Sequence, residues 1–358
     1  MRRVGTTALV PGMVTAEDVY NYNGNLILPK GLILTDKTIT KLTFYSIINV
    51  RVEDDVVKTL EETIPQENSY SERLKSSSEF KHFQKDFEEK TDSFRQSIND
   101  IVEQNVALDV DRLVEHAFSL LTSGGSRTNV FDMLLCMRQY DDATYVHSMN
   151  VALICNIFAH WLRMNEDEIK LATVCGLLHD IGKTKMPARV LGKPGKLTEW
   201  EYNLIKTHPK EGYDILQRFP IDDHIKNAAL MHHERCDGTG YPFGLTASQI
   251  DPYARLVAIA DVYDAMTCAR IYRGPLCPFK VISIFESEGL QKYDTRFIMT
   301  FLENIVDTYL LHRVRLTNGQ EGEIVYINTS RLSKPTIKIG NAYLDLSEEP
   351  HISIDSII

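Results

Sequence analysis

The sequence predicts a mainly α-helical protein with a small β-rich module at each end. Apolar residues recur with helical spacing from residue 95 to residue 312, and no part of that stretch alternates with period two. Residues 1–64 and 313–358 instead carry β-branched residues, alternation and turn signals. Residues 65–94 are polar and charged and predict a helical linker. The chain is therefore divided into four segments with these boundaries.

The first segment, residues 1–64, predicts short strands joined by tight turns. Pro-Gly at residues 11–12, Asn-Gly at 23–24 and Pro-Lys-Gly at 29–31 separate short apolar runs such as Leu26-Ile27-Leu28. The segment has no clustered histidine, cysteine or acidic residues. A docking or scaffold module is therefore favoured over a ligand sensor.

The linker, residues 65–94, contains four phenylalanines on one predicted helical face. They are Phe80, Phe83, Phe87 and Phe94, at spacings of three, four and seven residues. Such a stripe packs either against the rest of the same chain or against a partner chain. A homodimer through this helix is one expectation from the pattern.

The helical domain, residues 95–312, contains recognisable helix boundaries. Four helix starts and one end are expected: capping boxes at Asn165/Glu168 and Thr198/Glu201, starts at Asp251-Pro252 and Asp294, and a C-terminal cap at Gly289.

The last segment, residues 313–358, alternates apolar and polar residues. The alternating pairs are Val314/Leu316, Ile337/Ile339, Leu344/Leu346 and Ile352/Ile354. Asn318-Gly319 is typical of a hairpin turn. This segment predicts a small β module.

Composition narrows the class of function. Of 358 residues, 43% are hydrophobic and 25% charged, as in soluble globular proteins. A net charge of −10 argues against a DNA or RNA duplex as partner, because duplex binding depends on clustered Lys and Arg. No apolar run approaches the ~20 residues of a membrane-spanning helix. The six cysteines form no C-x-x-C pair, which favours a reduced, cytoplasmic protein.

Two motifs indicate chemistry. The first is the string from His232 to Pro242, which reads His-His-Glu-Arg-Cys-Asp-Gly-Thr-Gly-Tyr-Pro. The second is His179-Asp180-Ile181-Gly182-Lys183. Adjacent imidazoles with nearby carboxylates and a glycine-rich turn are typical of a metal-dependent phosphohydrolase site.

A dinuclear hydrolytic site needs several neutral imidazoles and a carboxylate that can bridge two cations. The helical domain supplies seven candidate ligands: His147, His179, Asp180, His208, His232, His233 and Asp261. Asp261 lies in the apolar run Leu256–Asp261, and burying its charge without a partner would be costly. A metal or a salt link would remove that cost.

The signals differ in specificity. A lone His-Asp pair such as His179-Asp180 is more often a surface or capping pair, and a lone His147 or His208 is more often a satisfied polar residue than a ligand. The eleven-residue string is specific, because many positions must coincide. Taken together, the motifs favour a metal site.

The two motifs resemble those of the HD-GYP family of cyclic-di-GMP phosphodiesterases, within the HD-domain superfamily of metal-dependent phosphohydrolases. The resemblance covers residues 140–285 closely and implies an HD-domain-type helical bundle. It implies that the seven candidates are the metal ligands and that Asp180 bridges two metals. The resemblance further implies two divalent metal ions per chain, iron or manganese.

The resemblance also assigns substrate-binding residues. Lys183 matches a lysine that contacts phosphate and aids catalysis, and residues 240–242 (Gly240, Tyr241, Pro242) match a loop at the substrate pocket. Arg270 and Arg273 match a basic pair that holds the dinucleotide phosphates, and a planar guanidinium suits that task. From their positions in the motif, Glu234 and Asp237 are expected to orient the ligands and the loop.

The implied reaction is the hydrolysis of cyclic-di-GMP to linear pGpG by a hydroxide that bridges the two metals. One departure from the family pattern concerns a third metal: some members carry a glutamate four residues before the first histidine, where this chain has Ala143. Two metals are therefore expected.

Two alternatives remain at this point. The substrate is another cyclic dinucleotide, or the domain binds a cyclic dinucleotide without turning it over and acts as a regulatory module. Metal content measured together with turnover of a generic phosphodiester separates the second alternative from an enzyme.

Overall fold

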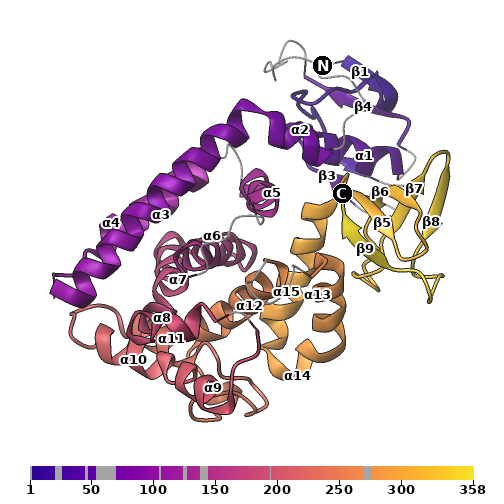
Figure 1. Ribbon diagram of the computed structural model, residues 1–358. Coiled ribbons are helices and arrows are strands. Elements are labelled where there is room, and N and C mark those ends of the chain that lie inside the picture. Colours follow the sequence, from indigo (N-terminus) through magenta and orange to yellow (C-terminus); the bar gives the residue numbers. More distant parts are fainter. Residues whose placement is uncertain are drawn as a thin grey trace. The chain divides into compact units, whose positions relative to one another are not determined.

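The computed structural model describes residues 2–20, 26–44, 47–53, 70–104, 106–123, 127–137, 144–193, 195–268 and 276–358. The chain divides into two compact units, residues 1–73 with 309–358, and residues 74–308 (Figure 1). The N-terminal and C-terminal segments thus belong to one unit, which their sequences do not reveal. Most described elements are helices, so the predicted mainly α class is confirmed.

The first unit contains three small antiparallel sheets and one α-helix in its described part. Its elements are β1 (Arg2–Gly5), η1 (Thr6–Ala8), β2 (Val19–Tyr20), β3 (Leu26–Leu28), α1 (Asp36–Phe44), β4 (Asn49–Val52), β5 (Arg313–Leu316), β6 (Glu321–Tyr326), β7 (Thr336–Ile339), β8 (Ala342–Asp345) and β9 (Ile354–Ile357). Strand β1 pairs with β4, and β2 with β3. The other strands form a five-stranded sheet in the order β8-β7-β6-β5-β9.

The expected C-terminal hairpin is present. Asn318-Gly319 turns between β5 and β6, and Gly319 has a φ of +85°, a conformation that glycine adopts without steric cost. In β5, Val314 and Leu316 are buried while the arginines between and before them are exposed. The period-two pattern therefore reflects one face of a half-buried sheet.

The second unit is helical in its described part. Its elements are α3 (Ser78–Gln104), α4 (Val110–Ser123), α5 (Arg127–Met137), α6 (Tyr145–Trp161), α7 (Glu166–Leu178), η2 (Ile181–Lys185), α8 (Ala188–Leu191), α9 (Glu199–Ile205), α10 (His208–Leu216), α11 (Asp223–Met231), η3 (Ala247–Gln249), α12 (Pro252–Thr267), α13 (Pro278–Ile284), η4 (Phe285–Gly289), α14 (Leu290–Lys292) and α15 (Thr295–Ile305). Two short helices, α2 (Tyr70–Ser76) and η5 (Val306–Tyr309), cross the unit boundaries.

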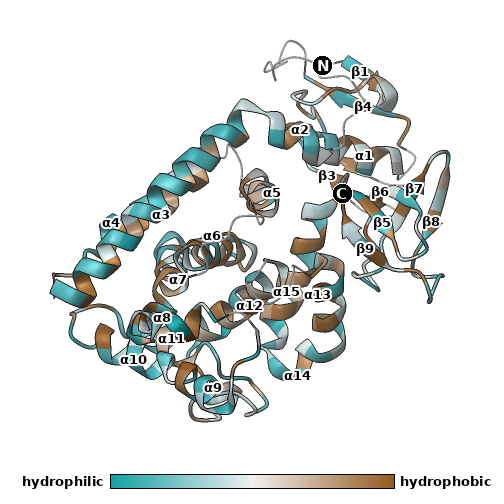
Figure 2. Ribbon diagram, in the orientation of Figure 1, coloured by the Kyte–Doolittle hydropathy of each residue, from teal (hydrophilic) through white to brown (hydrophobic). Residues whose placement is uncertain are grey.

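Helix α3 is amphipathic, whereas α6 is apolar almost all round. The four phenylalanines of α3 are all buried, and the helix packs on α4 and α6 of the same unit. Much of the rest of α3 is hydrophilic (Figure 2). In α6 every residue from His147 to Ala159 is buried. The phenylalanine stripe is thus covered by the chain itself, and a homodimer through α3 stays a prediction.

In the described part of the chain, no helix combines the length and the apolar character needed to cross a bilayer.

The helix starts follow the capping chemistry of the sequence. Asn165 with Glu168 and Thr198 with Glu201 form reciprocal capping boxes. The side chains of Asp251 and Asp294 accept backbone N–H bonds at the starts of α12 and α15. All four expected starts are confirmed.

The expected end at Gly289 is wrong. Gly289 has a right-handed helical φ of −67°, and the chain continues through the π-helical turn η4 into α14. A C-terminal glycine cap needs positive φ. Here the glycine lies against Phe285 and Ile298, so its small size serves packing.

Helices α6 and α7, which hold candidate ligands, pack closely at Gly176. A Cβ atom at this position would lie 2.9 Å from Cys155 Sγ and 3.0 Å from the Ala152 Cα. Any side chain at residue 176 would therefore push α7 away from α6. The glycine sets the separation of the two helices.

Candidate metal centre

The predicted ligands come from five helices of the second unit and lie mostly at helix ends. His147 is in the first turn of α6, and His179 and Asp180 directly follow α7. His208 opens α10, and His232 and His233 follow α11. Asp261 lies within α12 and is buried, as its apolar surroundings in the sequence suggested. The structure brings all seven side chains together.

Three of the histidines are held in the same tautomer by backbone carbonyls. The Nδ1 atoms of His179 and His208 lie 2.7 Å from the carbonyl oxygens of Gly176 and Ile205. The Nδ1 of His232 lies 3.0 Å from the carbonyl oxygen of Ala229. Since a carbonyl only accepts, each Nδ1 carries a proton, and in the neutral ring Nε2 then presents its lone pair. This is the form in which imidazole binds a metal.

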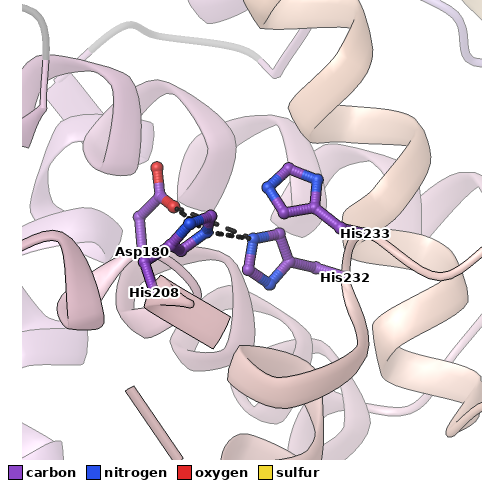
Figure 3. Close-up of side chains that lie close together, drawn as sticks. All are labelled: Asp180, His208, His232 and His233. Carbon is purple, nitrogen blue, oxygen red and sulfur yellow. Dashed lines mark hydrogen bonds and ion pairs between the residues drawn. The ribbon is translucent and has the colours of Figure 1, made fainter. Parts of the chain in front are cut away.

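The Nε2 atoms converge on the carboxylate of Asp180. Its Oδ1 lies 3.2 Å from Nε2 of His208 and 3.7 Å from that of His232, and its Oδ2 lies 3.4 Å from Nε2 of His179. The Nε2 atoms of His208 and His232 are 3.2 Å apart. Figure 3 shows Asp180, His208 and His232 directed toward one another, with His233 beside them. Lone pairs and a carboxylate at such distances repel unless a cation lies among them.

Two buried atoms support this interpretation. Neither Nε2 of His179 nor Oδ1 of Asp180 has a hydrogen-bond partner within the described residues, although both are buried. Buried polar atoms are nearly always paired with protein, water or an ion. Two groups of donor atoms each fit a metal, Asp180 with His208, His232 and His233, and Asp180 with His147 and His179. Asp180 belongs to both groups, so the donor set fits metal ions on either side of its carboxylate.

His147 is fixed by two aspartates of α12. Its Nε2 lies 3.0 Å from Asp261 Oδ1, and its Nδ1 lies 2.7 Å from Asp264 Oδ2. Asp264 is buried and was missed in the sequence. The signal was its position three residues after Asp261, which places both carboxylates on one face of α12. A carboxylate behind a metal-binding histidine orients the ring and raises its basicity.

Charge in the centre follows from burial and these contacts. Burial would raise the pKa of Asp180, but Lys183 and His179 hold it well below its usual range. Burial lowers the pKa of His232, and the neighbouring His179 and His208 lower it further. Burial and the adjacent His232 likewise lower the pKa of His233. The centre thus offers the ionised carboxylate of Asp180 and the neutral imidazoles of His232 and His233.

The pKa of His147 moves the other way. Burial would lower it, but the hydrogen bonds to Asp261 and Asp264 raise it to about 9. A metal that binds this Nε2 would have to displace a proton.

Lys183 lies one turn after the His-Asp pair, in η2. Its Nζ donates a hydrogen bond to Asp180 Oδ2. Glycine at residue 182 allows this turn to touch α10, since a Cβ there would lie 2.0 Å from the carbonyl oxygen of His208. The ammonium is thereby held at the edge of the centre, where an incoming anion would meet it.

The loop after the adjacent histidines is held by Glu234. This buried carboxylate accepts hydrogen bonds from the backbone N–H groups of Phe243 and Leu245, at 2.7 and 2.9 Å. Gly240 packs against the backbone of Glu234, where a Cβ would lie 2.4 Å from its Cα. Asp237 is exposed and accepts from the N–H and hydroxyl groups of Thr239.

Tyr241 is the loop residue that reaches the centre. Its ring stacks on His233 with 4.6 Å between ring centres, and burial raises the pKa of its hydroxyl group, which stays neutral. Pro242 follows it through a cis peptide bond and is exposed. Arg270, Arg273 and Ala143 lie outside the described residues.

Comparison with known proteins identifies the fold of this unit. A model of the HD domain matches residues 129–297. A cyclic di-GMP phosphodiesterase of Pseudomonas aeruginosa is 34% identical over 212 residues, which cover 59% of this chain and 51% of that protein.

Two further relatives match shorter stretches. A 3'3'-cGAMP-specific phosphodiesterase of Vibrio cholerae is 42% identical over 169 residues, 47% of this chain and 39% of that protein. A cyclic di-GMP phosphodiesterase response regulator of Xanthomonas campestris is 42% identical over 137 residues, 37% of this chain and 36% of that protein. The chain thus spans about half or less of the length of these relatives. The helical unit of this chain thus contains an HD domain together with both motifs that are typical of the HD-GYP family.

Proposed function

We propose that this chain is a metal-dependent phosphodiesterase that hydrolyses cyclic-di-GMP to linear pGpG. The observation that carries the proposal is the Asp180 carboxylate, which belongs to two groups of side chains that could each hold a metal ion. A carboxylate shared by two such groups suits a two-metal phosphodiesterase. The family relationship, and the relatives named cyclic di-GMP phosphodiesterases, support the choice of substrate.

The proposal assigns one metal to each group of donors. His208, His232, His233 and Asp180 would hold one ion, and His147, His179 and Asp180 the other, with Asp261 beside His147 and His233 as a further ligand. Mixed nitrogen and oxygen donors suit divalent iron or manganese. Bound metals lower the pKa of water and neutralise charge on phosphoryl oxygens.

The residues of the chain then have separate tasks. Lys183 stabilises the negative charge that develops on the phosphoryl group, from its position beside Asp180. Asp264 keeps His147 in the ligating orientation. Glu234 holds the loop that carries Tyr241 against His233. Arg270 and Arg273 are proposed to bind the phosphates from the segment after α12.

The expected number of metals is two per chain. Ala143, four residues before His147 in the sequence, has no side-chain atom that can bind a cation. A third ion there would keep mostly water and bind weakly. Elemental analysis of purified protein should therefore approach two metals per chain, and pGpG should accumulate. A stoichiometry near three would contradict this count and leave the phosphodiesterase proposal standing.

Hydrolysis of a different cyclic dinucleotide is the second candidate. The observation that favours it is the Vibrio cholerae relative, which is 42% identical and is named as specific for 3'3'-cGAMP. A module that binds without turnover is less well supported, because the seven candidate side chains lie close together and Lys183 pairs with Asp180.

The test is a substrate panel. Protein purified without oxygen and loaded with iron or manganese is incubated with cyclic-di-GMP, 3'3'-cGAMP and cyclic-di-AMP, and the products are separated by chromatography. The proposal predicts pGpG from cyclic-di-GMP as the fastest product. Faster cleavage of 3'3'-cGAMP would establish the second candidate, and metal uptake with no cleavage would establish the binding module.

A further inference from the structure

Lys206 carries a positive charge close to the metal centre and is not one of the candidate metal ligands. It follows the last residue of α9, and its Nζ lies 5.5 Å from the ring centre of Tyr202 and 4.9 Å from that of Tyr241. Tyr241 in turn stacks on the candidate ligand His233. The ammonium group is therefore one aromatic ring away from the metal centre.

This charge is not neutralised by the surrounding protein. Within the described residues, no carboxylate lies within 4.0 Å of the Lys206 Nζ, whereas Lys183 pairs with Asp180 and Lys193 pairs with Glu201. Aromatic faces attract a cation through their quadrupole but bring no net negative charge. A partly buried cation between two rings therefore still favours an anion beside it.

The proposed substrate has two phosphodiester groups, each with one negative charge. The metal donors and Lys183 gather around the Asp180 carboxylate, so they serve the group that is hydrolysed. The second group needs a cation of its own at some distance from the metals. Lys206 meets this description among the described residues, and Tyr202 and Tyr241 restrict where its ammonium group can lie.

We propose, on the basis of the proposed function, that Lys206 binds the phosphate of the cyclic dinucleotide that is not being hydrolysed. The residue is then a determinant of specificity for substrates with two phosphates. It acts from the α9 side of the centre, in addition to the arginines proposed after α12. The alternative is a purely structural role, in which Lys206 only keeps the ring of Tyr241 stacked on His233.

Two substrates separate these roles. Cyclic-di-GMP has two phosphodiester groups, and bis(p-nitrophenyl) phosphate has one. Lys206→Gln should raise the KM for cyclic-di-GMP about ten-fold or more, the loss expected for one charge-assisted bond to phosphate. Its kcat/KM for bis(p-nitrophenyl) phosphate and its metal content should stay at the wild-type values.

Two further variants complete the design. Lys206→Arg keeps the positive charge and should retain most of the affinity for cyclic-di-GMP. Lys85→Gln makes the same change of charge on α3, at a side chain that is 74% exposed, and should behave as wild type on both substrates.

Equal losses on both substrates would overturn the inference and assign Lys206 to the support of Tyr241. Unchanged kinetics on both substrates would also overturn it, since the second phosphate would then be held elsewhere. A wild-type enzyme that cleaves bis(p-nitrophenyl) phosphate but no cyclic dinucleotide would refute the proposed function itself and this subsite with it. The wild-type result therefore distinguishes the two failures.

Discussion

At the scale of single residues, Asp180 has a special place because its two oxygens face different groups of imidazoles. Asp180 could be proposed as a ligand from the His-Asp motif together with the second motif. Its central position could not, because the distances to His208 and His232 depend on how three helices pack. Such distances are set by tertiary contacts that no local pattern encodes.

The first prediction separates metal binding from phosphate stabilisation. Asp180→Ala should abolish turnover and full metal loading, because it removes the donor common to both groups. Lys183→Ala should keep the metal content near wild type and lower kcat by about 100-fold or more, the usual loss for one preorganised donor. Metal content by elemental analysis and kcat are measured on the same samples.

Lys185→Ala is the matched control for the lysine variant. This side chain lies in the same turn η2 but is exposed, so both metal content and kcat should be unchanged. Equal metal loss in the Asp180 and Lys183 variants would show that the two residues do not have separate tasks.

The second prediction concerns Asp264, the residue that sequence reasoning missed. Asp264→Ala leaves the Nδ1 of His147 without its carboxylate partner. Loss of such a partner typically lowers metal affinity or activity by about 10- to 100-fold. Titration with manganese should show one weakened site, and the group around His232 should keep its ion. Unchanged affinity at both sites would exclude Asp264 from the positioning of His147.

At the scale of elements, most of the centre is built from helix ends. Close contacts between neighbouring elements determine the positions of these ends. The capping residues in the sequence located the starts of α7, α9, α12 and α15 correctly. They gave no information on how closely the elements approach. Gly182, inside the His-Asp motif, sets the contact between η2 and α10, and only the three-dimensional packing shows this.

The third prediction tests that contact. Gly182→Ala would place a Cβ 2.0 Å from the His208 carbonyl oxygen and 2.5 Å from the Gly212 nitrogen, so η2 must move away from α10. Overpacking of this kind costs about 1–3 kcal/mol of unfolding free energy. The shift also separates Asp180 from His208, so metal content should fall. Denaturant unfolding and elemental analysis measure the two effects.

Gly289→Ala is the control for this substitution. Gly289 is helical, and an added Cβ would make an ordinary contact at 3.4 Å with Ile298. Alanine should therefore be neutral or slightly stabilising there, because it is the better helix former. Full metal content in Gly182→Ala would mean that the approach of η2 to α10 does not position the ligands.

At the scale of the whole molecule, the chain combines a helical unit that contains an HD domain with a β-rich unit formed by its two end segments. The spacing of apolar residues changes from helical to period two at residue 313, and this change predicted the C-terminal strands. The His-Asp and His-His motifs predicted the resemblance to the HD-GYP family. The association of the two end segments in one unit could not be predicted, because it brings together residues 1–73 and 309–358, from opposite ends of the sequence. Contacts of that kind leave no local signal.

The central claim is that metal ions held around Asp180 drive phosphodiester cleavage. The most direct measurement is the rate of pGpG formation from cyclic-di-GMP by one protein preparation in three states: metal-loaded, stripped by chelation and dialysis, and reloaded with iron or manganese. The account predicts turnover in the first state, loss in the second and recovery in the third, with metal content following the rate. Full activity in the stripped protein would contradict it.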